Sequence, residues 1–323
     1  MLDDLLNLIT QATDVRPQFT GGRCLAVRRS PDACTACQDV CPHEAVEVAS
    51  HGVTIDDVAC TGCGLCVQAC PSDALEARVS LRPEGQVKCR EVQGDAQTVE
   101  CLARLRPTDV TGLARGSGSA TLAHGDCASC TIGDASVPER VAATVATAKS
   151  LAAPLGANLD VQVVQSSELN TGPKVMDRRA FLRSTGGQWR RQFGQALSPL
   201  DRPRAGDLPV EPSRQRELAL AAAKGEDDGV AWRLPTVDDR CIMCDACTRT
   251  CPTDALSRRF HHDGSASLHL NAERCIGCDA CVPACPTNAV TMTDQPTARA
   301  VRSKDVELFN RPAADRTAVA RDG

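Results

Sequence analysis

The chain has very few aromatic side chains. Among its 323 residues there is no tyrosine, and the aromatic fraction is 2%. Large aromatic side chains bury much apolar area, so a chain this poor in them has a weak core for its length. Something else must stabilise the fold, and the 20 cysteines are the residues that can do so.

Other absences narrow the function. No run approaches 18 apolar residues, so we expect no membrane span. The net charge of −5 gives no basic footprint for nucleic acid. The opening segment MLDDLLNLITQAT carries acids where a secretion signal needs positive charge, so we expect a short amphipathic helix and a cytoplasmic protein. No nucleotide-binding fingerprint is present. No Ser/His/Asp or Cys/His arrangement stands out, so no catalytic residue is predicted.

The cysteines fall into blocks of eight, four and eight, which are all multiples of four. Disulfide frameworks belong to small secreted chains, so metal sites are favoured over disulfides. Tetra-thiolate ligation would give five sites. The three blocks are Cys24, Cys34, Cys37, Cys41, Cys60, Cys63, Cys66 and Cys70; then Cys89, Cys101, Cys127 and Cys130; then Cys241, Cys244, Cys247, Cys251, Cys275, Cys278, Cys281 and Cys285.

The first and last blocks are two copies of one unit. The pattern C-P-x-x-A-[VL] occurs at positions 41, 70, 251 and 285. Between the paired copies lie the segments VEVASHGVTID and LSRRFHHDGSASLHL, each alternating and each with a central glycine. Such segments are typical of β-hairpins.

Three stretches match the run C-x2-C-x2-C-x3-C-P in full: CTGCGLCVQACP, CIMCDACTRTCP and CIGCDACVPACP. Three cysteines at this spacing wrap a tight loop around one face of a cluster, whose sulfurs loop N–H groups can reach. The proline stops the following helical turn at the fourth cysteine. Structural zinc sites use pairs of C-x2-C and need no such run.

These motifs resemble the bacterial-type two-[4Fe-4S] ferredoxin family, twice. In that family the fourth cysteine of each run binds the other cluster. The resemblance implies four [4Fe-4S] clusters, with these ligand sets: Cys241, Cys244, Cys247 and Cys285; Cys275, Cys278, Cys281 and Cys251; Cys60, Cys63, Cys66 and Cys41; and Cys34, Cys37 and Cys70 with one thiolate still to be found.

The incomplete set begins in SPDACTACQDVCP, where Pro31 holds the place of the first cysteine. Cys24 is the only cysteine further upstream. It lies in GRCLAVRR, an alternating stretch that predicts a strand, and a turn around Pro31 allows the chain to fold back. Cys24 is therefore predicted to fill the vacant corner. The alternative is a three-ligand cluster with Cys24 as an ordinary buried thiol.

The middle block has a different setting. GQVKC, SATLAHG and NLDVQVVQ are predicted strands, while TDVTGLARG and PERVAATVATAKSLAA are predicted helices. This alternation favours a small parallel α/β layer, with the cysteines at the carboxyl ends of its strands. The spacing of Cys89, Cys101, Cys127 and Cys130 is similar to the iron–sulfur delta subunit of methyl-viologen-reducing hydrogenases. That resemblance implies a [2Fe-2S] centre linking a hydrogenase to a disulfide reductase. A structural zinc ion is the alternative.

The predicted fold is α+β: two dicluster units flank a small α/β domain. The expected boundaries are a first unit at 1–83, the four-cysteine domain at 84–168, a linker at 169–235 with a helix at 214–225, and a second unit at 236–323. Arg178 and Arg179 imitate an export motif, but we interpret them as a solvated helix start. His124, His261 and His262 are predicted to be surface residues or to lie next to ligands.

The predicted function is multi-cluster electron transfer within a larger redox complex, between an upstream oxidoreductase and a downstream acceptor. Hydrogen bonds and burial around the thiolates would set each potential. One alternative is an enzyme whose active site is the middle metal centre. Another is a scaffold whose metals only stabilise a weak fold.

Overall fold

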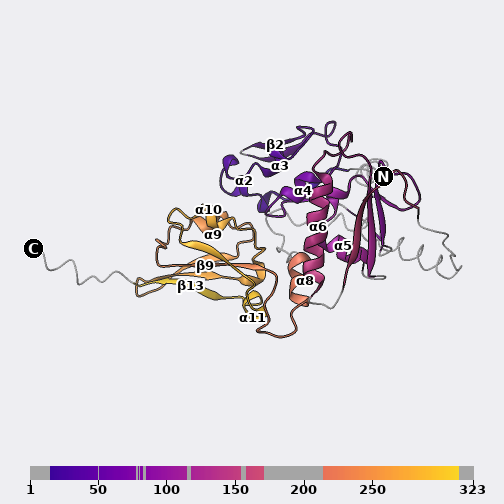
Figure 1. The fold of residues 1–323 in the computed structure, drawn as a ribbon. Helices are drawn as coiled ribbons and strands as arrows, with labels where there is room; N and C mark the ends of the chain where they lie inside the picture. Colours follow the sequence, from indigo (N-terminus) through magenta and orange to yellow (C-terminus); the bar gives the residue numbers. More distant parts are fainter. Residues whose placement is uncertain are drawn as a thin grey trace, which may run out of the picture.

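The computed structural model describes residues 15–49, 51–77, 79, 81–82, 85–114, 118–153, 158–170 and 214–312. The predicted leading helix and the pair Arg178 and Arg179 lie outside the described residues. Figure 1 shows three parts: an N-terminal unit, a middle domain beside it, and a C-terminal unit at the other side of the molecule. Mixed helix and strand was expected, and the structure has both.

The middle domain is built on a four-stranded sheet of order β6-β5-β7-β8, in which every neighbouring pair is parallel. The predicted parallel layer is thus confirmed. Strand β6 was not predicted, because its three residues are too few to show a period. The elements are β5 (Gln86–Cys89), β6 (Gln97–Val99), the turn η3 (Leu102–Arg104), α5 (Pro107–Ala114), β7 (Ser119–His124), α6 (Val137–Ala152) and β8 (Asp160–Gln165).

The N-terminal unit contains the predicted hairpin, with β2 antiparallel to β3, and a short outer pair in which β1 is antiparallel to β4. The outer pair joins the chain before the first cysteine to the chain after the last one. Its elements are β1 (Gln18–Phe19), η1 (Gly21–Arg23), α2 (Leu25–Arg28), η2 (Pro31–Ala33), α3 (Ala36–Asp39), β2 (Val46–Ala49), β3 (Gly52–Ile55), α4 (Leu65–Ala69) and β4 (Leu75–Glu76).

The C-terminal unit repeats this plan with longer strands. The hairpin β10-β11 gains a third strand, β13, and the outer pair is β9-β12. Its elements are β9 (Arg233–Val237), α9 (Ala246–Thr250), β10 (Leu256–Phe260), β11 (Ala266–Leu270), η5 (Ala272–Arg274), α10 (Cys281–Ala284), β12 (Val290–Asp294), α11 (Ala298–Val301) and β13 (Val306–Arg311).

The apolar cores connect the three parts. The core of the middle domain includes Cys63 and Leu65 of the N-terminal unit, so these two parts share one core. The helix predicted in the linker is α8 (Arg214–Ala221), which packs on α5 and α6. Its Ala219 and Leu220 join Leu151 of α6 in the core of the C-terminal unit. Figure 1 shows α8 lying beside α6.

The strand predicted around Cys24 is wrong. Residues 21–23 form the turn η1, and α2 begins immediately after Cys24. The sequence alternates there, but burial does not: Leu25 and Ala26 are adjacent and both buried, while Val27 is 40% exposed. A strand would send neighbouring side chains to opposite faces.

Candidate metal centres

All twenty cysteines lie in the described part of the chain, and all are free thiols. No helix among the described residues is long and apolar enough to cross a membrane. The positions of the thiols decide which sites can form, and their mutual electrostatic effects show which thiols are neighbours.

In the N-terminal unit, one group is made by the thiols of Cys41, Cys60, Cys63 and Cys66. Burial raises the pKa of Cys66 to about 12, and the charges of Cys63, Cys60, Cys37 and Cys41 raise it further. The same causes raise the pKa of Cys63, first burial and then the charges of Cys41 and Cys60. The influence of Cys37 on Cys66 shows that a second group lies directly beside the first.

That second group includes Cys24. Burial raises the pKa of Cys37 to about 12, with further contributions from Cys70, Cys34 and Cys24. Burial also raises the pKa of Cys34, and the charges of Cys70 and Cys24 add to it. Cys24 itself is 8% exposed. The structure thus brings Cys24 to the three thiols whose set lacked a member.

The C-terminal unit holds two more groups. Burial raises the pKa of Cys247 to about 11, followed by the charges of Cys241, Cys244 and Cys285. These four thiols line one cavity with about 370 Å³ of empty space.

The other C-terminal group is more deeply buried. Burial raises the pKa of Cys278 to about 12, and the charges of Cys251 and Cys275 follow. Burial also raises the pKa of Cys281, where the neighbouring charges are those of Cys275, Cys278, Cys251 and Cys247. Cys247 belongs to the first C-terminal group, so the two groups are adjacent.

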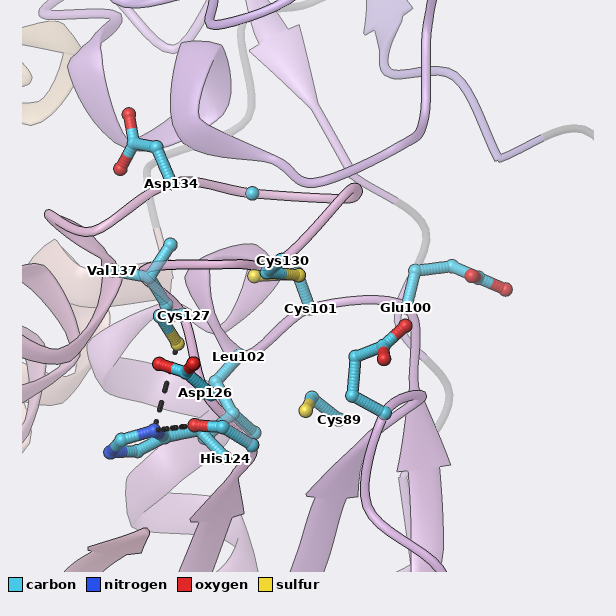
Figure 2. Close-up of a pocket in the computed structure, with 13 residues that line it drawn as sticks. Cys89, Glu100, Cys101, Leu102, His124, Asp126, Cys127, Cys130, Asp134 and Val137 are labelled. Carbon is cyan, nitrogen blue, oxygen red and sulfur yellow. Dashed lines mark hydrogen bonds between the residues drawn. The ribbon is translucent and has the colours of Figure 1, made fainter.

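The middle four cysteines line a cavity with about 330 Å³ of empty space. Figure 2 shows their side chains around it. Cys89 ends β5 and Cys101 precedes η3, while Cys127 and Cys130 follow β7. Burial raises the pKa of Cys101 to about 12, and the charges of Cys63, Cys127 and Cys89 raise it further. The middle group is therefore next to the Cys41 group of the N-terminal unit.

His124 lies beside this cavity and is buried. Its Nδ1 is 2.8 Å from the carbonyl oxygen of Gly125 and 3.6 Å from Sγ of Cys127. Because a carbonyl oxygen only accepts, the hydrogen bond to Gly125 requires a proton on Nδ1, and Figure 2 marks the contacts of Nδ1 with dashed lines. This agrees with the prediction that His124 lies next to a ligand, and the exposure of His261 and His262 agrees with a surface position.

The spacing of the thiols can be compared with that of a single-ion site. Four thiolates bound to zinc at about 2.3 Å stand about 3.8 Å apart by tetrahedral geometry. Within the described residues, which include every cysteine, no three His, Cys, Asp or Glu side chains come together closely enough to hold one ion. The thiols are nonetheless grouped in fours, as ligands of a larger inorganic core would be.

The three complete motifs share an unusual backbone. The residues on either side of the second cysteine have positive φ in each of them: Gly62 and Gly64, Met243 and Asp245, Gly277 and Asp279. The left-handed conformation costs conformational free energy for Met243 and the two aspartates. The surrounding structure must therefore stabilise the cysteine loop in this conformation. In the interrupted motif the equivalent residues, Ala33 and Thr35, do not have positive φ.

Cys24 nevertheless has the backbone of a first ligand. It follows the 3₁₀ turn η1 and has φ −74° and ψ 125°. Cys275 follows the 3₁₀ turn η5 and has φ −73° and ψ 122°. With Cys24 taken as the first cysteine, residues 25–33 separate it from Cys34, where the complete motifs have two residues.

The fourth cysteine of a run receives hydrogen bonds that sequence reasoning missed. The N–H of Ala255 donates to Sγ of Cys251 at 3.2 Å, and the hydroxyl of Thr253 lies 3.6 Å from it. The pattern is therefore C-P-[ST]-x-A. The Ser or Thr after the proline is visible in the sequence and could have predicted the contact with sulfur. The other copies are Ala74 and Ser72 at Cys70, and Ala289 and Thr287 at Cys285.

The copy at Cys41 has His43 in place of the hydroxyl residue. Nε2 of His43 is 2.9 Å from the carbonyl oxygen of Ile132, which also accepts from Thr61 Oγ1 at 2.7 Å. Ile132 lies two residues after Cys130. His43 thus contacts the middle domain from the position at which the other three copies place a hydroxyl beside the sulfur.

A Ser/His/Asp arrangement that the sequence did not reveal lies in the C-terminal unit. Ser267 Oγ is 2.8 Å from Nε2 of His269, whose Nδ1 is 2.6 Å from Oδ1 of Asp305. His261 Nε2 also lies 2.7 Å from the serine oxygen. Ser267 is 0% exposed, so no substrate reaches its hydroxyl. The network links β11, which contains Ser267 and His269, to Asp305, the residue before β13 in the same sheet.

Comparison with protein families agrees with the outer two groups of motifs. The 4Fe-4S dicluster domain matches residues 32–74 and 240–289. The dicluster ferredoxin arrangement is thus present twice, and it supports four [4Fe-4S] clusters and an iron–sulfur electron-transfer role. The first match begins after Cys24. No curated protein matches the chain.

Proposed function

We propose that the protein is a relay subunit with five iron–sulfur sites, passing electrons between two redox partners of a larger complex. The observation that carries this proposal is the arrangement of all twenty cysteines as five groups of four, each adjacent to another group. An iron–sulfur cluster supplies reversible one-electron storage.

The residues proposed as ligands are those named by the sequence. Cys24 completes the set of Cys34, Cys37 and Cys70. Its support is the shared burial of these thiols and the match between its backbone angles and those of Cys275. The other three sets in the dicluster units follow the family pattern.

The middle set of Cys89, Cys101, Cys127 and Cys130 is proposed to hold a [2Fe-2S] centre. Its support is the four-thiol lining of the cavity, together with the finding that no three His, Cys, Asp or Glu side chains of the described residues are grouped closely enough to hold one ion. The likeness of this region to the delta subunit of methyl-viologen-reducing hydrogenases makes a hydrogenase and a disulfide reductase the classes of partner to test first.

One partner is proposed to dock beside Cys244, the only exposed cysteine of the twenty. Ile242 in the same loop is 51% exposed, and Phe260 is 71% exposed with the guanidinium of Arg258 over its ring. Exposed apolar side chains around a site suit transient contact with another protein. In each transfer a donor iron–sulfur or flavin protein loses one electron, and the acceptor protein gains it.

Metal analysis with a redox titration tests the proposal. Protein purified without oxygen should contain about 18 iron atoms, for four [4Fe-4S] centres and one [2Fe-2S] centre. About 16 iron atoms with one zinc would make the middle site structural. Little iron, or clusters that no physiological donor reduces, would contradict the relay and favour a scaffold.

A further inference from the structure

The segment inserted in the interrupted motif reaches a neighbouring unit. Residues 25–33 include α2, which contacts α9 of the C-terminal unit. Figure 1 shows α2 on the side of the N-terminal unit that faces α9 and α10. In the complete motifs only two residues separate the first two cysteines, so no helix is available at this place.

Arg28 makes the polar part of this contact. Its guanidinium pairs with the carboxylate of Asp254. Its Nε donates to the carbonyl oxygen of Arg249 at 3.4 Å, and its Nη1 donates to that of Gly22 at 3.1 Å. The Arg28 side chain is only 20% exposed. One arginine thus ties the turn before Cys24 to the end of α9.

Asp254 occupies a repeated position. It is the fourth residue of CPTDAL and has φ +50°. Asp73, at the same place in CPSDAL, has φ +53° and accepts from Nη1 of Arg106 at 3.2 Å. Arg106 belongs to the middle domain, immediately before α5. In both cases the aspartate of the turn receives an arginine from an adjacent part of the molecule.

We propose that residues 25–33 are an intramolecular docking element, in which Arg28 orients the C-terminal unit by binding the aspartate of its CPTDAL turn. The fourth position of the C-P-x-x-A-[VL] pattern is then a binding site for arginine, used by Arg28 at Asp254 and by Arg106 at Asp73. The insertion that separates Cys24 from Cys34 replaces a tight loop with this docking element.

This docking contact links the cysteine groups of the N-terminal unit to those of the C-terminal unit. The middle group adjoins the Cys41 group through Cys101 and Cys63, and the Cys41 group adjoins the Cys24 group through Cys66 and Cys37. Arg28 then joins the Cys24 side to the turn that follows Cys251. The N-terminal unit therefore contacts both of the other parts, although the middle domain separates it from the C-terminal unit in the sequence. The importance of this docking contact for electron transfer rests on the proposed function.

Arg28 orients the C-terminal unit but does not hold it alone. The apolar contact of Leu151 with Ala219 and Leu220 is a separate attachment through α6 and α8. The ion pair is partly exposed, with Asp254 at 60%, and such pairs contribute little to global stability. Loss of Arg28 should therefore loosen the contact between α2 and α9 without unfolding either unit.

Hydrogen exchange on the cluster-loaded full chain tests the proposal, with iron content measured on the same samples. Arg28→Glu should speed amide exchange in α2 and α9 by about two- to fivefold, because the new carboxylate repels Asp254. Arg29→Glu is the matched control, since Arg29 is the exposed next residue. It should leave both helices unchanged.

A double-mutant cycle completes the test. Asp254→Asn keeps the left-handed turn, because Asn288 adopts the same conformation at the equivalent place with φ +53°. Arg28→Gln and Asp254→Asn should each speed exchange, and the double variant should exchange no faster than the faster single one. Additive effects, or equal exchange in Arg28→Glu and the native protein, would overturn the docking role. Iron content unchanged throughout would leave the cluster assignment standing, so the two proposals fail separately.

Discussion

The two dicluster units differ in how they arrange the cysteines that we propose as ligands. The C-terminal unit uses two complete loops with left-handed residues on both sides of the second cysteine. The N-terminal unit uses one complete loop and one interrupted by residues 25–33. Yet Cys24 and Cys275 have nearly the same backbone angles after a 3₁₀ turn. The comparison teaches that the local backbone at a cysteine can be the same in both units although the spacing to the next cysteine differs.

The units also differ in their surroundings. The N-terminal unit shares a core with the middle domain and touches the C-terminal unit through α2. The C-terminal unit has a core of its own, to which α8 contributes, and carries the exposed Cys244. We therefore expect a substitution in a cluster-binding loop of the N-terminal unit to destabilise the protein more than the matched substitution in the C-terminal unit.

The largest expected effect comes from removing the third cysteine of a triplet in either unit. Cys281→Ala and Cys37→Ala should each lower the iron content by about four atoms, or leave a three-iron form, because an open corner exposes iron to solvent. Iron analysis with electron paramagnetic resonance measures this. Val58→Ala, at a side chain that is 97% exposed, is the control and should keep full iron. A normal iron content in Cys37→Ala alone would show that the interrupted motif holds no cluster.

A smaller effect should separate the matched glycines Gly62 and Gly277. Both have positive φ, which costs an alanine about 1–2 kcal/mol. A Cβ at Gly62 would also lie 2.6 Å from Cβ of Val15 and 2.9 Å from its carbonyl oxygen, whereas at Gly277 the nearest atom is 3.5 Å away. Gly62→Ala should therefore destabilise the protein by a further ~1–3 kcal/mol.

Thermal unfolding of the loaded protein without oxygen measures this difference. The melting temperature should fall more for Gly62→Ala than for Gly277→Ala. Equal falls would mean that Val15 moves aside and that the crowding around the N-terminal loop has no energetic weight.

The smallest effect concerns the hydroxyl beside the fourth cysteine. Thr253→Val removes a donor from Sγ of Cys251, and a hydrogen bond worth about 0.5–1.5 kcal/mol corresponds to roughly 20–60 mV for a one-electron couple. The potential of that site should fall by this amount, because hydrogen bonds to sulfur favour the reduced cluster. A titration monitored by electron paramagnetic resonance measures it. Thr253→Ser keeps the hydroxyl and should keep the potential.

Most of the regular secondary structure and the repeated cysteine motifs could be predicted from the sequence. Both hairpins, the parallel sheet, the main helices and the dicluster motifs follow from spacing and period, and the structure or the family match agrees with them. It failed around Cys24, where four helical residues between turns are too short to show a helical period. It also missed the contacts of Arg28 and Asp254, which are more than 200 residues apart. Such pairings depend on how whole units pack, and no local pattern contains that information.

The role of Cys24 is tested most directly by Cys24→Ala, with iron content and electron paramagnetic resonance measured on protein purified without oxygen. We expect an oxidised [3Fe-4S] signal or the loss of about four iron atoms, with the other sites intact because they share no thiolate with Cys24. Full iron with an unchanged spectrum would contradict it, and Cys24 would then be an ordinary core thiol.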